Sequence, residues 1–375
     1  MFSVTSGSEG SNYEHPSDVK LLHFTHKRRI IHRAILKKDD FIVVTDALVF
    51  STNAVMPIVL AIAFGYILKR IGLLTKEFLD VGNKLTFRVF LPAMLFYNVY
   101  GISSLGEINF KFVLFGVVMI LVIFAIAVFA GCMFTKDNAK RGALVQAIFR
   151  SNYAIIGIPL AASLFGDRGV AAAGVMSAFC VPLFNTLGVV ALTFWNSDNE
   201  KKKISLKKIV TGVITNPLII ATVSGLAVLA FREMFMQLGI GFRLSDVTVL
   251  YKLLESVQSV CTPFALIVLG GRFEFSAVSR LWREIVFGTV IRTVVVPVIG
   301  LMAAYLMRDM LGLSGEHFAT FIGVFATPVA VASAIMAKEM GADDELAGQL
   351  VVWTSLVSTV TIFIYVTLLR FAGIF

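Results

Sequence analysis

From residue 49 to its end, the chain alternates long apolar runs with short polar stretches. The runs are roughly 18 to 25 residues long, which suits helices that cross a bilayer, whereas the strands of a barrel would alternate in segments of about ten. Ten such runs predict an all-α integral membrane protein with ten transmembrane helices. The runs cover about 50–68, 78–100, 110–134, 152–166, 170–195, a sixth run from 217, 247–270, 285–307, 317–340 and 346–369.

The fourth run, Asn152 to Gly166, contains residues that break helices. Pro159 lacks a backbone N–H and clashes with the carbonyl four residues earlier, and Gly157 loosens the same turn. Such a break is tolerated at membrane depth only where protein or a water-filled cavity surrounds it, so broken helices tend to mark substrate sites. The ninth run is interrupted in the same way by Pro328. We therefore expect the two breaks to face each other and to form the site.

The prolines also indicate an internal repeat. Three pairs recur in order at offsets of 160, 171 and 169 residues, namely Pro57 and Pro217, Pro92 and Pro263, and Pro159 and Pro328. Each half holds five runs, an odd number, so the halves enter the membrane from opposite sides, as the inverted repeats of secondary transporters do. The alternative is coincidence, because prolines are common in membrane helices.

The repeat predicts how runs four and nine cross. Two antiparallel broken helices would direct the positive N-termini of their half-helices at the crossing point. The side-chain donors of Asn152 and Thr327 would add to these ends. The crossing is therefore expected to bind an anion, as helix N-termini do elsewhere.

Composition agrees with a membrane protein and limits the alternatives. Hydrophobic residues make up 57% of the chain and charged residues 15%, and the mean hydropathy is +0.85. The net charge of +9 does not indicate nucleic-acid binding, because the basic residues cluster in loops, where they serve as an orientation signal. Cys132, Cys180 and Cys261 fall within predicted helices at no metal-ligand spacing, so we expect neither a metal nor a cofactor.

The distribution of Lys and Arg predicts the orientation. Fifteen of them lie in the loops after runs one, three, five, seven and nine, which places these loops in the cytoplasm and both termini outside. The chain then divides into a first five-helix repeat (49–195), a basic cytoplasmic loop (196–208) and a second repeat (209–375). Apolar residues at helical spacing from Ile204 to Val213 predict a short amphipathic helix on the membrane surface.

Residues 1–48 form a basic N-terminal extension without an apolar run of spanning length. It lacks the charged, apolar and small-residue segments of a signal peptide. We expect it to be disordered or to lie on the surface, unless the start codon has been assigned too early and the native chain begins near residues 43–48. Its basic charge contradicts an outside N-terminus, which favours the early start assignment.

Several segments resemble the auxin efflux carrier family. NYAIIGIPL resembles its first crossover, ATPVAVASAIMAKEMG its second, and FLPAMLF, TNPLIIATVSGL and TPFALIVLG further signatures, so the likeness extends from about residue 49 to the end. It implies a sodium/proton antiporter-like fold with a scaffold of helices 1, 2, 6 and 7 and a transport domain of helices 3–5 and 8–10. Plant members export auxin, and bacterial members, which this chain resembles, are linked to malate or malonate. Plant members also carry an acid in the third helix. Residues 110–134 contain none, which puts a plant-like site in doubt.

The crossover motifs give the candidate substrate-binding residues, which are Asn152, Gly157, Ile158, Pro159, Thr327 and Pro328. The resemblance implies that Asn152 and the turns at the two prolines contact the substrate. An intramembrane amide can also serve only as a contact between helices.

Four further residues are accessory candidates, namely Arg150, Asn185, Lys338 and Glu339. Arg150 would either neutralise a carboxylate or extend to the cytoplasmic face. Lys338 and Glu339 fit an interfacial position, and Glu339 is the best candidate for a group that carries protons. Glu255 and Arg292 lie inside predicted spans, where buried charges are expected to be paired.

These patterns predict a secondary transporter, or permease, that moves a small organic anion across the plasma membrane by an elevator-type alternating-access mechanism. The anion would be a mono- or dicarboxylate such as malate, and a homodimer is left open. The alternatives are a sodium- or proton-coupled carrier of another small solute, or a channel or receptor on the same scaffold. An enzyme is not expected, because no nucleophile, base and orienting group occur together.

Overall fold

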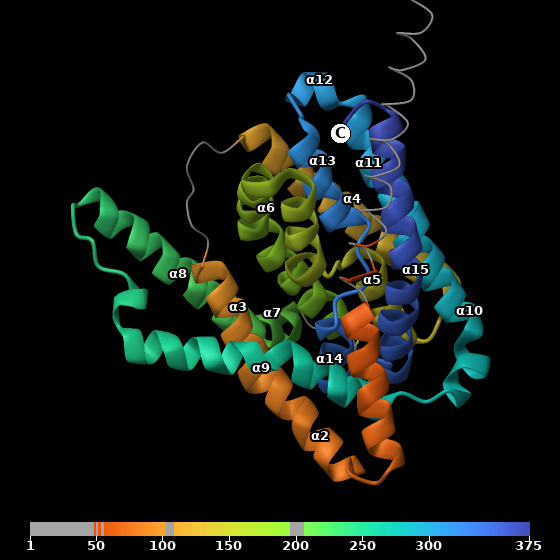
Figure 1. The fold of residues 1–375 in the computed structure, drawn as a ribbon. Coiled ribbons are helices and arrows are strands. Elements are labelled where there is room, and N and C mark those ends of the chain that lie inside the picture. Colours follow the sequence, from red (N-terminus) through yellow and green to blue (C-terminus); the bar gives the residue numbers. More distant parts are fainter. Residues whose placement is uncertain (1–48, 50–51, 54–55, 102–108, 196–205) are drawn as a thin grey trace, which may run out of the picture. The chain divides into compact units, whose positions relative to one another are not determined.

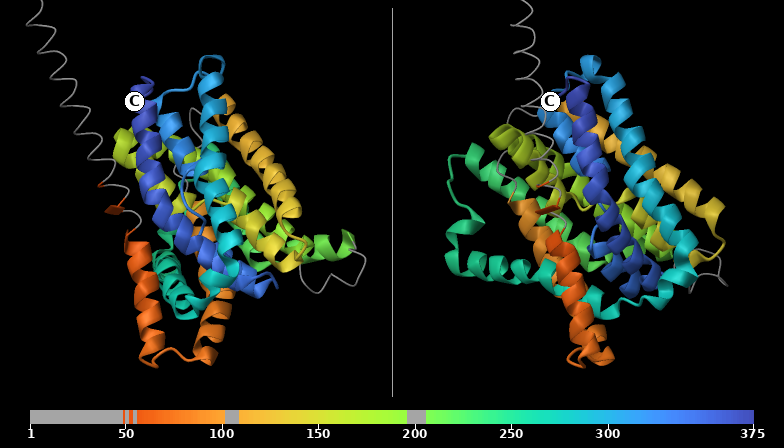
Figure 2. Two further views of the ribbon diagram at one scale, coloured as in Figure 1. Left: turned by 90° about the vertical axis from the view of Figure 1, so that its right-hand side faces the viewer. Right: turned by 45° about the vertical axis from the view of Figure 1, so that its right-hand side comes forward.

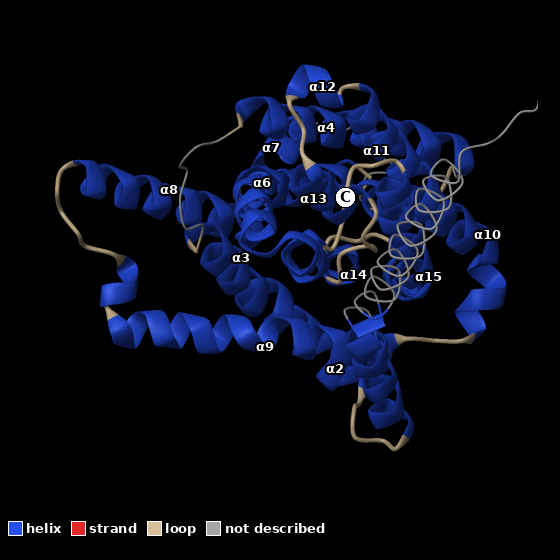
Figure 3. Cartoon of the chain, turned by 45° about the horizontal axis from the view of Figure 1, so that its top comes forward, coloured by secondary structure: helices blue, strands red, loops and turns tan. Residues whose placement is uncertain are grey.

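The computed structural model describes residue 49 and residues 52–53, 56–101, 109–195 and 206–375. The basic N-terminal extension and most of the predicted basic loop, residues 196–205, lie outside the described residues. The part of the chain that is described consists of helices joined by loops and turns, with no strand (Figures 1 and 3). The prediction of an all-α protein is confirmed for these residues.

Most of the helices overlap the predicted runs, but α5 (Asn138–Phe149) lies before the fourth run, where no run was predicted. In chain order they are 56–70, α2 (Lys76–Leu85), α3 (Leu91–Tyr100), α4 (Phe110–Phe134), α5 (Asn138–Phe149), α6 (Ile158–Phe194), α7 (Leu206–Ile214), α8 (Pro217–Gln237), α9 (Thr248–Arg272), α10 (Ser276–Val290), α11 (Val296–Leu306), α12 (Arg308–Leu311), α13 (Gly315–Phe325), α14 (Ala332–Glu339) and α15 (Asp344–Phe371). Three π-helical turns join some of them, namely η1 (Thr86–Phe90), η2 (Tyr153–Gly157) and η5 (Ile291–Val295). The short helix predicted near 204–213 is confirmed as α7.

Six continuous helical segments in the described chain are long and apolar enough to cross a bilayer, namely Phe110–Phe134, Tyr153–Phe194, Pro217–Gln237, Thr248–Arg272, Ser276–Leu306 and Asp344–Phe371. The second of these holds parts of two predicted runs, because Gly166, with φ of 55°, turns the chain between them. Large apolar side chains such as Val249 and Phe110 are exposed on the outer faces, as contact with lipid requires. The protein is therefore a multi-pass membrane protein.

The helices form two groups by packing. The hairpin group comprises residues 56–70, α2, α3, α8 and α9, and the crossing group comprises α4–α6, α10, α11 and α13–α15. In the hairpin group, glycines let helix backbones touch: a Cβ on Gly65 would lie 2.2 Å from the Ile267 carbonyl oxygen, and one on Gly270 would lie 1.9 Å from that of Ile62. Figure 2 shows residues 56–100 as an orange hairpin beside α9.

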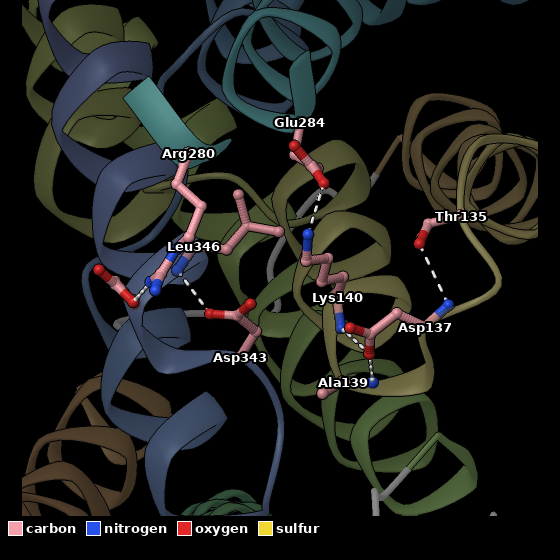
Figure 4. Close-up of polar contacts among 9 residues, drawn as sticks. Thr135, Asp137, Ala139, Lys140, Arg280, Glu284, Asp343 and Leu346 are labelled. Carbon is pink, nitrogen blue, oxygen red and sulfur yellow. Dashed lines mark hydrogen bonds and ion pairs between the residues drawn. The ribbon is translucent and has the colours of Figure 1, made fainter. Parts of the chain in front are cut away.

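The loop between α4 and α5 (135–137), the loop between α9 and α10 (273–275) and the loop between α14 and α15 (340–343) lie at one end of the crossing group. We call this end the basic-loop end. Here the Asp137 carboxylate caps the start of α5, and the Lys140 ammonium lies 2.7 Å from the Glu284 carboxylate of α10 (Figure 4). The Asp343 N–H donates to the Ala139 carbonyl at 3.1 Å, so the α14–α15 loop contacts α5. Burial raises the pKa of the Asp343 carboxyl above its usual value. These contacts tie α5, α10 and α15 together.

Candidate functional site

The two predicted breaks meet inside the crossing group. The chain is extended between α5 and η2 and again between α13 and α14, and Ser151 and Val329 pair as an isolated antiparallel bridge. The Asn152 N–H donates to the Pro328 carbonyl at 2.8 Å. Each extended stretch thus satisfies part of the other's backbone, which an apolar interior requires. The expectation that the breaks face each other is confirmed.

The position of the first break differs from the one expected. Helix ends at Phe149 and resumes at Tyr153, so Pro159 lies inside the second half-helix. The π-helical turn η2 ends two residues before this proline, and η1 and η5 likewise end two residues before Pro92 and Pro297. A π turn widens the helix, so the proline ring and its missing donor are accommodated without a break.

Two glycines allow the half-helices to cross in backbone contact. A Cβ on Gly157 would lie 2.9 Å from the Cα of Gly323 in α13, and a Cβ on Gly323 would lie 2.8 Å from the Cα of Gly157. Both glycines are buried. Gly157, expected at the substrate, therefore serves the contact between the half-helices.

A pocket of about 60 Å³ lies beside the crossing, between the two helix groups. Its walls include α3 and α9 of the hairpin group and α6 of the crossing group. The first residues of the half-helix after the first break, 153–155, and those at the start of α14, 330–332, also line it. We call it the crossing pocket. Two helix N-termini, each with a partial positive charge, open into it.

Polar side chains in the crossing pocket are buried yet incompletely bonded. Asn152 and Ser151 are each 4% exposed and line the pocket. The Asn152 Nδ2 and the Ser151 Oγ have no hydrogen-bond partner within the described chain. Since an unpaired buried donor is costly, these two groups are suited to bind a ligand oxygen.

Arg150 brings a full positive charge to the crossing pocket. It is 4% exposed, and its Nη2 donates to the Asn185 Oδ1 at 2.6 Å while its Nη1 faces the Met336 sulfur. The Asn185 amide is itself held by a bond from its Nδ2 to the Val181 carbonyl. Within the described chain, no carboxylate lies within 4.0 Å of the guanidinium, as none of the ion pairs includes it. A buried cation without a counter-ion is costly, so the Arg150 guanidinium is suited to bind an anion.

The other predicted ligands do not line the crossing pocket. Ile158 is half-buried and Pro159 is exposed on the same half-helix. The Thr327 hydroxyl donates to the Gly323 carbonyl at 2.7 Å, and the Pro328 carbonyl accepts from the first break. These residues shape the crossing, whereas Arg150, Asn152 and Asn185 face the pocket.

Lys338 and Glu339 belong to a different region. A second, polar pocket of about 410 Å³ lies towards the basic-loop end, between α2 and α9 on one side and α14 and α15 on the other, and Lys338 lines it. Glu339 accepts a hydrogen bond at 2.8 Å from Asn83 of α2, which also donates to the Ile335 carbonyl at 3.4 Å. Asn83 is 1% exposed and spans the two helix groups. We call this contact the Asn83 bridge.

The two intramembrane charges expected to be paired behave differently. Glu255 is exposed on α9, and Arg292 is completely buried and donates only to backbone carbonyls. The expectation of ionic pairing was wrong because the ends of broken helices offer carbonyl acceptors in place of carboxylates. Sequence reasoning also missed Ser151 and the role of Asn83, both of which depend on contacts distant in the chain.

Ligands for a metal ion do not assemble in the described part of the chain. Among these residues, no three His, Cys, Asp or Glu side chains lie close enough together to hold one. His317 instead completes the start of α13, where its Nδ1 lies 2.8 Å from the Ser314 hydroxyl. The polar groups at the crossing are donors and a cation, so they suit an anionic ligand.

Comparison with known proteins covers nearly the whole apolar part of the chain. A family described as "Membrane transport protein" matches residues 50–366. A protein of Methanothermobacter thermautotrophicus named "Uncharacterized transporter" is 23% identical over 319 residues, which span 83% of this chain and 96% of that protein.

Proposed function

The chain belongs to the membrane transport protein family, the family of the auxin efflux carriers, and from this premise we propose that it is a secondary carrier of a small organic anion. The solute would be a mono- or dicarboxylate such as malate, bound in the crossing pocket. The membrane would be the plasma membrane, with the basic-loop end in the cytoplasm.

The charge of the crossing pocket carries this proposal. Arg150 contributes one full positive charge, and each of the two helix N-termini contributes about half a charge. Asn152 and Ser151 add donors that have no partner in the described chain. The sum, about two positive charges in a region of low dielectric, suits one or two carboxylates.

The packing of two glycines supports an inverted repeat. Gly65, in the first helix of the first repeat, packs against α9, and Gly225, in the first helix of the second repeat, packs against α3, where a Cβ added to it would lie 3.1 Å from the Cβ of Val99. Under the predicted repeat, α9 corresponds to α3 and α8 to residues 56–70. The two glycine contacts are therefore equivalent, as an inverted repeat predicts.

The two pockets support alternating access by relative movement of the two helix groups. The crossing pocket and the polar pocket both lie between these groups, and the Asn83 bridge joins α2 to α14 next to the polar pocket. Movement of the crossing group along the hairpin group would open the bound anion to one side and then to the other. In this mechanism the hairpin group is the scaffold and the crossing group is the transport domain.

A ligand screen on purified protein tests the proposal. Malate, malonate, other dicarboxylates and indole acids are added singly, and thermal unfolding is followed. A true ligand at 100 times its Kd stabilises the protein by about 2.7 kcal/mol. Asn152→Ala should unfold at the wild-type temperature without ligand and lose the shift. An equal shift in Asn152→Ala would remove the crossing pocket from the binding site.

The matched control is Asn138→Ala. Asn138 lies at the start of α5 and accepts a bond from Arg141, far along the helix from the break. This variant should keep the full ligand-induced shift. No shift with any anion in the wild-type protein would contradict the proposed solute class.

A further inference from the structure

The half-helices that precede the two breaks, α5 and α13, end with backbone carbonyls directed into an apolar interior. The last carbonyls of any helix lack partners within it, and each unsatisfied group is costly where water is absent. At the crossing, these carbonyls belong to Ile148 and Phe149 at the end of α5, to Val324 at the end of α13, and to Thr327 two residues beyond α13. They come from both breaks, so one hydrogen-bond donor group placed between them can bind carbonyls of both helix ends.

Arg292 is that group. Its guanidinium is 0% exposed and donates five hydrogen bonds to these four carbonyls. The bonds to Thr327 measure 2.9 Å from Nε and 2.7 Å from Nη2, and the bond from Nη2 to Val324 measures 3.3 Å. The bonds from Nη1 reach Ile148 at 3.2 Å and Phe149 at 3.4 Å. A planar fork with fixed donors matches this arrangement, whereas an ammonium cannot reach both helices in the same way.

The backbone that carries Arg292 is held in turn by α15. Arg292 lies in η5, whose π-helical geometry frees carbonyls from the regular helical pattern. The Tyr365 hydroxyl donates to the Thr293 carbonyl at 3.1 Å or to that of Val294 at 3.2 Å. The backbone next to Arg292 is thus held by a hydrogen bond from α15.

The charge of Arg292 also affects the electrostatic potential at the crossing. Each helix C-terminus carries about half a negative charge, so one guanidinium balances the ends of α5 and α13. The helix N-termini and Arg150 then remain to set the potential of the crossing pocket. Without the charge at Arg292, two negative helix ends would act on the same pocket.

We propose that Arg292 is a positioning residue that clamps together the C-terminal ends of α5 and α13, the half-helices that precede the two breaks, through their backbone carbonyls and balances the negative charge of those ends. Its effect on anion binding rests on the proposed function. Its effect on the geometry of the crossing does not depend on the proposed function. An experiment can therefore contradict the clamp without contradicting the proposed function, and the reverse.

A disulfide across the crossing tests the clamp without any substrate. Ser151 and Val329 pair in an antiparallel bridge, so cysteines at both positions can form a disulfide when oxidised. The chain for this test has Cys132, Cys180 and Cys261 replaced by alanine. In monodisperse protein, Arg292→Gln and Arg292→Met should form the disulfide at least about tenfold more slowly than wild type. Arg292→Lys keeps the charge, so it should fold and should be slowed only a few-fold.

Gly288→Ala serves as the structural control. It lies in α10, and its added Cβ would meet the Leu350 Cδ2 at 2.6 Å, so it disturbs packing without touching the carbonyls. It should lower the unfolding temperature but keep the wild-type rate of disulfide formation. A wild-type rate in folded Arg292→Gln or Arg292→Lys, or an equal slowing in Gly288→Ala, would overturn the clamp.

Discussion

Of the described side chains that line the crossing pocket, Arg150 alone carries a full charge. Its hydrogen bond to Asn185 fixes the guanidinium but does not neutralise it. A bound carboxylate would do so, and charge-assisted hydrogen bonds are about twice as strong as neutral ones. Recognition of the anion should therefore depend more on this residue than on the neutral donors beside it.

Arg150→Gln should weaken anion binding by about 10- to 100-fold, because a bond to a charged group is worth about 1.5–3 kcal/mol. Arg150→Lys should keep part of the affinity, since the charge remains. Isothermal titration with the anion found in the screen measures both. Arg283→Gln, which removes an exposed arginine on α10, is the control and should bind as wild type. Equal affinities for Arg150→Gln and Arg283→Gln would show that the guanidinium does not contact the anion.

Arg150 and Asn152 were identified from the sequence because polar residues stand out at the start of an apolar run or just before it. The contacts that give other residues their roles are not visible in this way. Ser151 lines the pocket because its stretch pairs with Val329 of the other break, and the ligands of Arg292 are carbonyls, which every residue has. Such roles follow only from the folded arrangement.

At the scale of the element, the half-helix pair depends on a close backbone contact and not on the prolines that first indicated it. Pro159 lies within a continuous helix after η2, while the first break occurs at a stretch without proline. Sequence reasoning placed the break within residues 152–166, several residues late, and did not predict α5, the half-helix before it. The reason is physical: a π turn can absorb a proline, and the sequence does not reveal which helices contain one.

Gly157→Ala and Gly323→Ala should each lower the free energy of unfolding by about 1–3 kcal/mol, because the new Cβ would overlap the facing backbone. Gly174→Ala in α6 is the matched control, since its added Cβ meets nothing within 4 Å. It should leave stability unchanged or raise it slightly. Thermal unfolding of the three purified variants measures the difference. A Gly157→Ala protein as stable as Gly174→Ala would contradict the tight crossing.

At the scale of the whole molecule, the described helices form two groups that meet along the pockets. Most ion pairs stay within a group or its loops. Two contacts beside the polar pocket join one group to the other, namely the Asn83 bridge and the ion pair between Arg272 of α9 and Asp344 of α15, at 3.6 Å. Movement of one group against the other would break both contacts and remake them. The run pattern predicted the helices and their order, but the grouping of helices into two bodies depended on the resemblance to a family.

Counterflow in proteoliposomes, measured with and without a covalent cross-link that locks the two helix groups together, tests the account most directly. Vesicles preloaded with the unlabelled anion should transiently accumulate the labelled anion, as a carrier requires and a channel does not allow. In a chain without its native cysteines, a short bifunctional thiol reagent that links cysteines at Asn83 and Glu339 should abolish counterflow, and cleaving the link should restore it. The same link between Lys140 and Glu284, within the crossing group, should leave counterflow intact. Flux without counterflow, or undiminished counterflow in the locked protein, would contradict a carrier that works by movement of one helix group against the other.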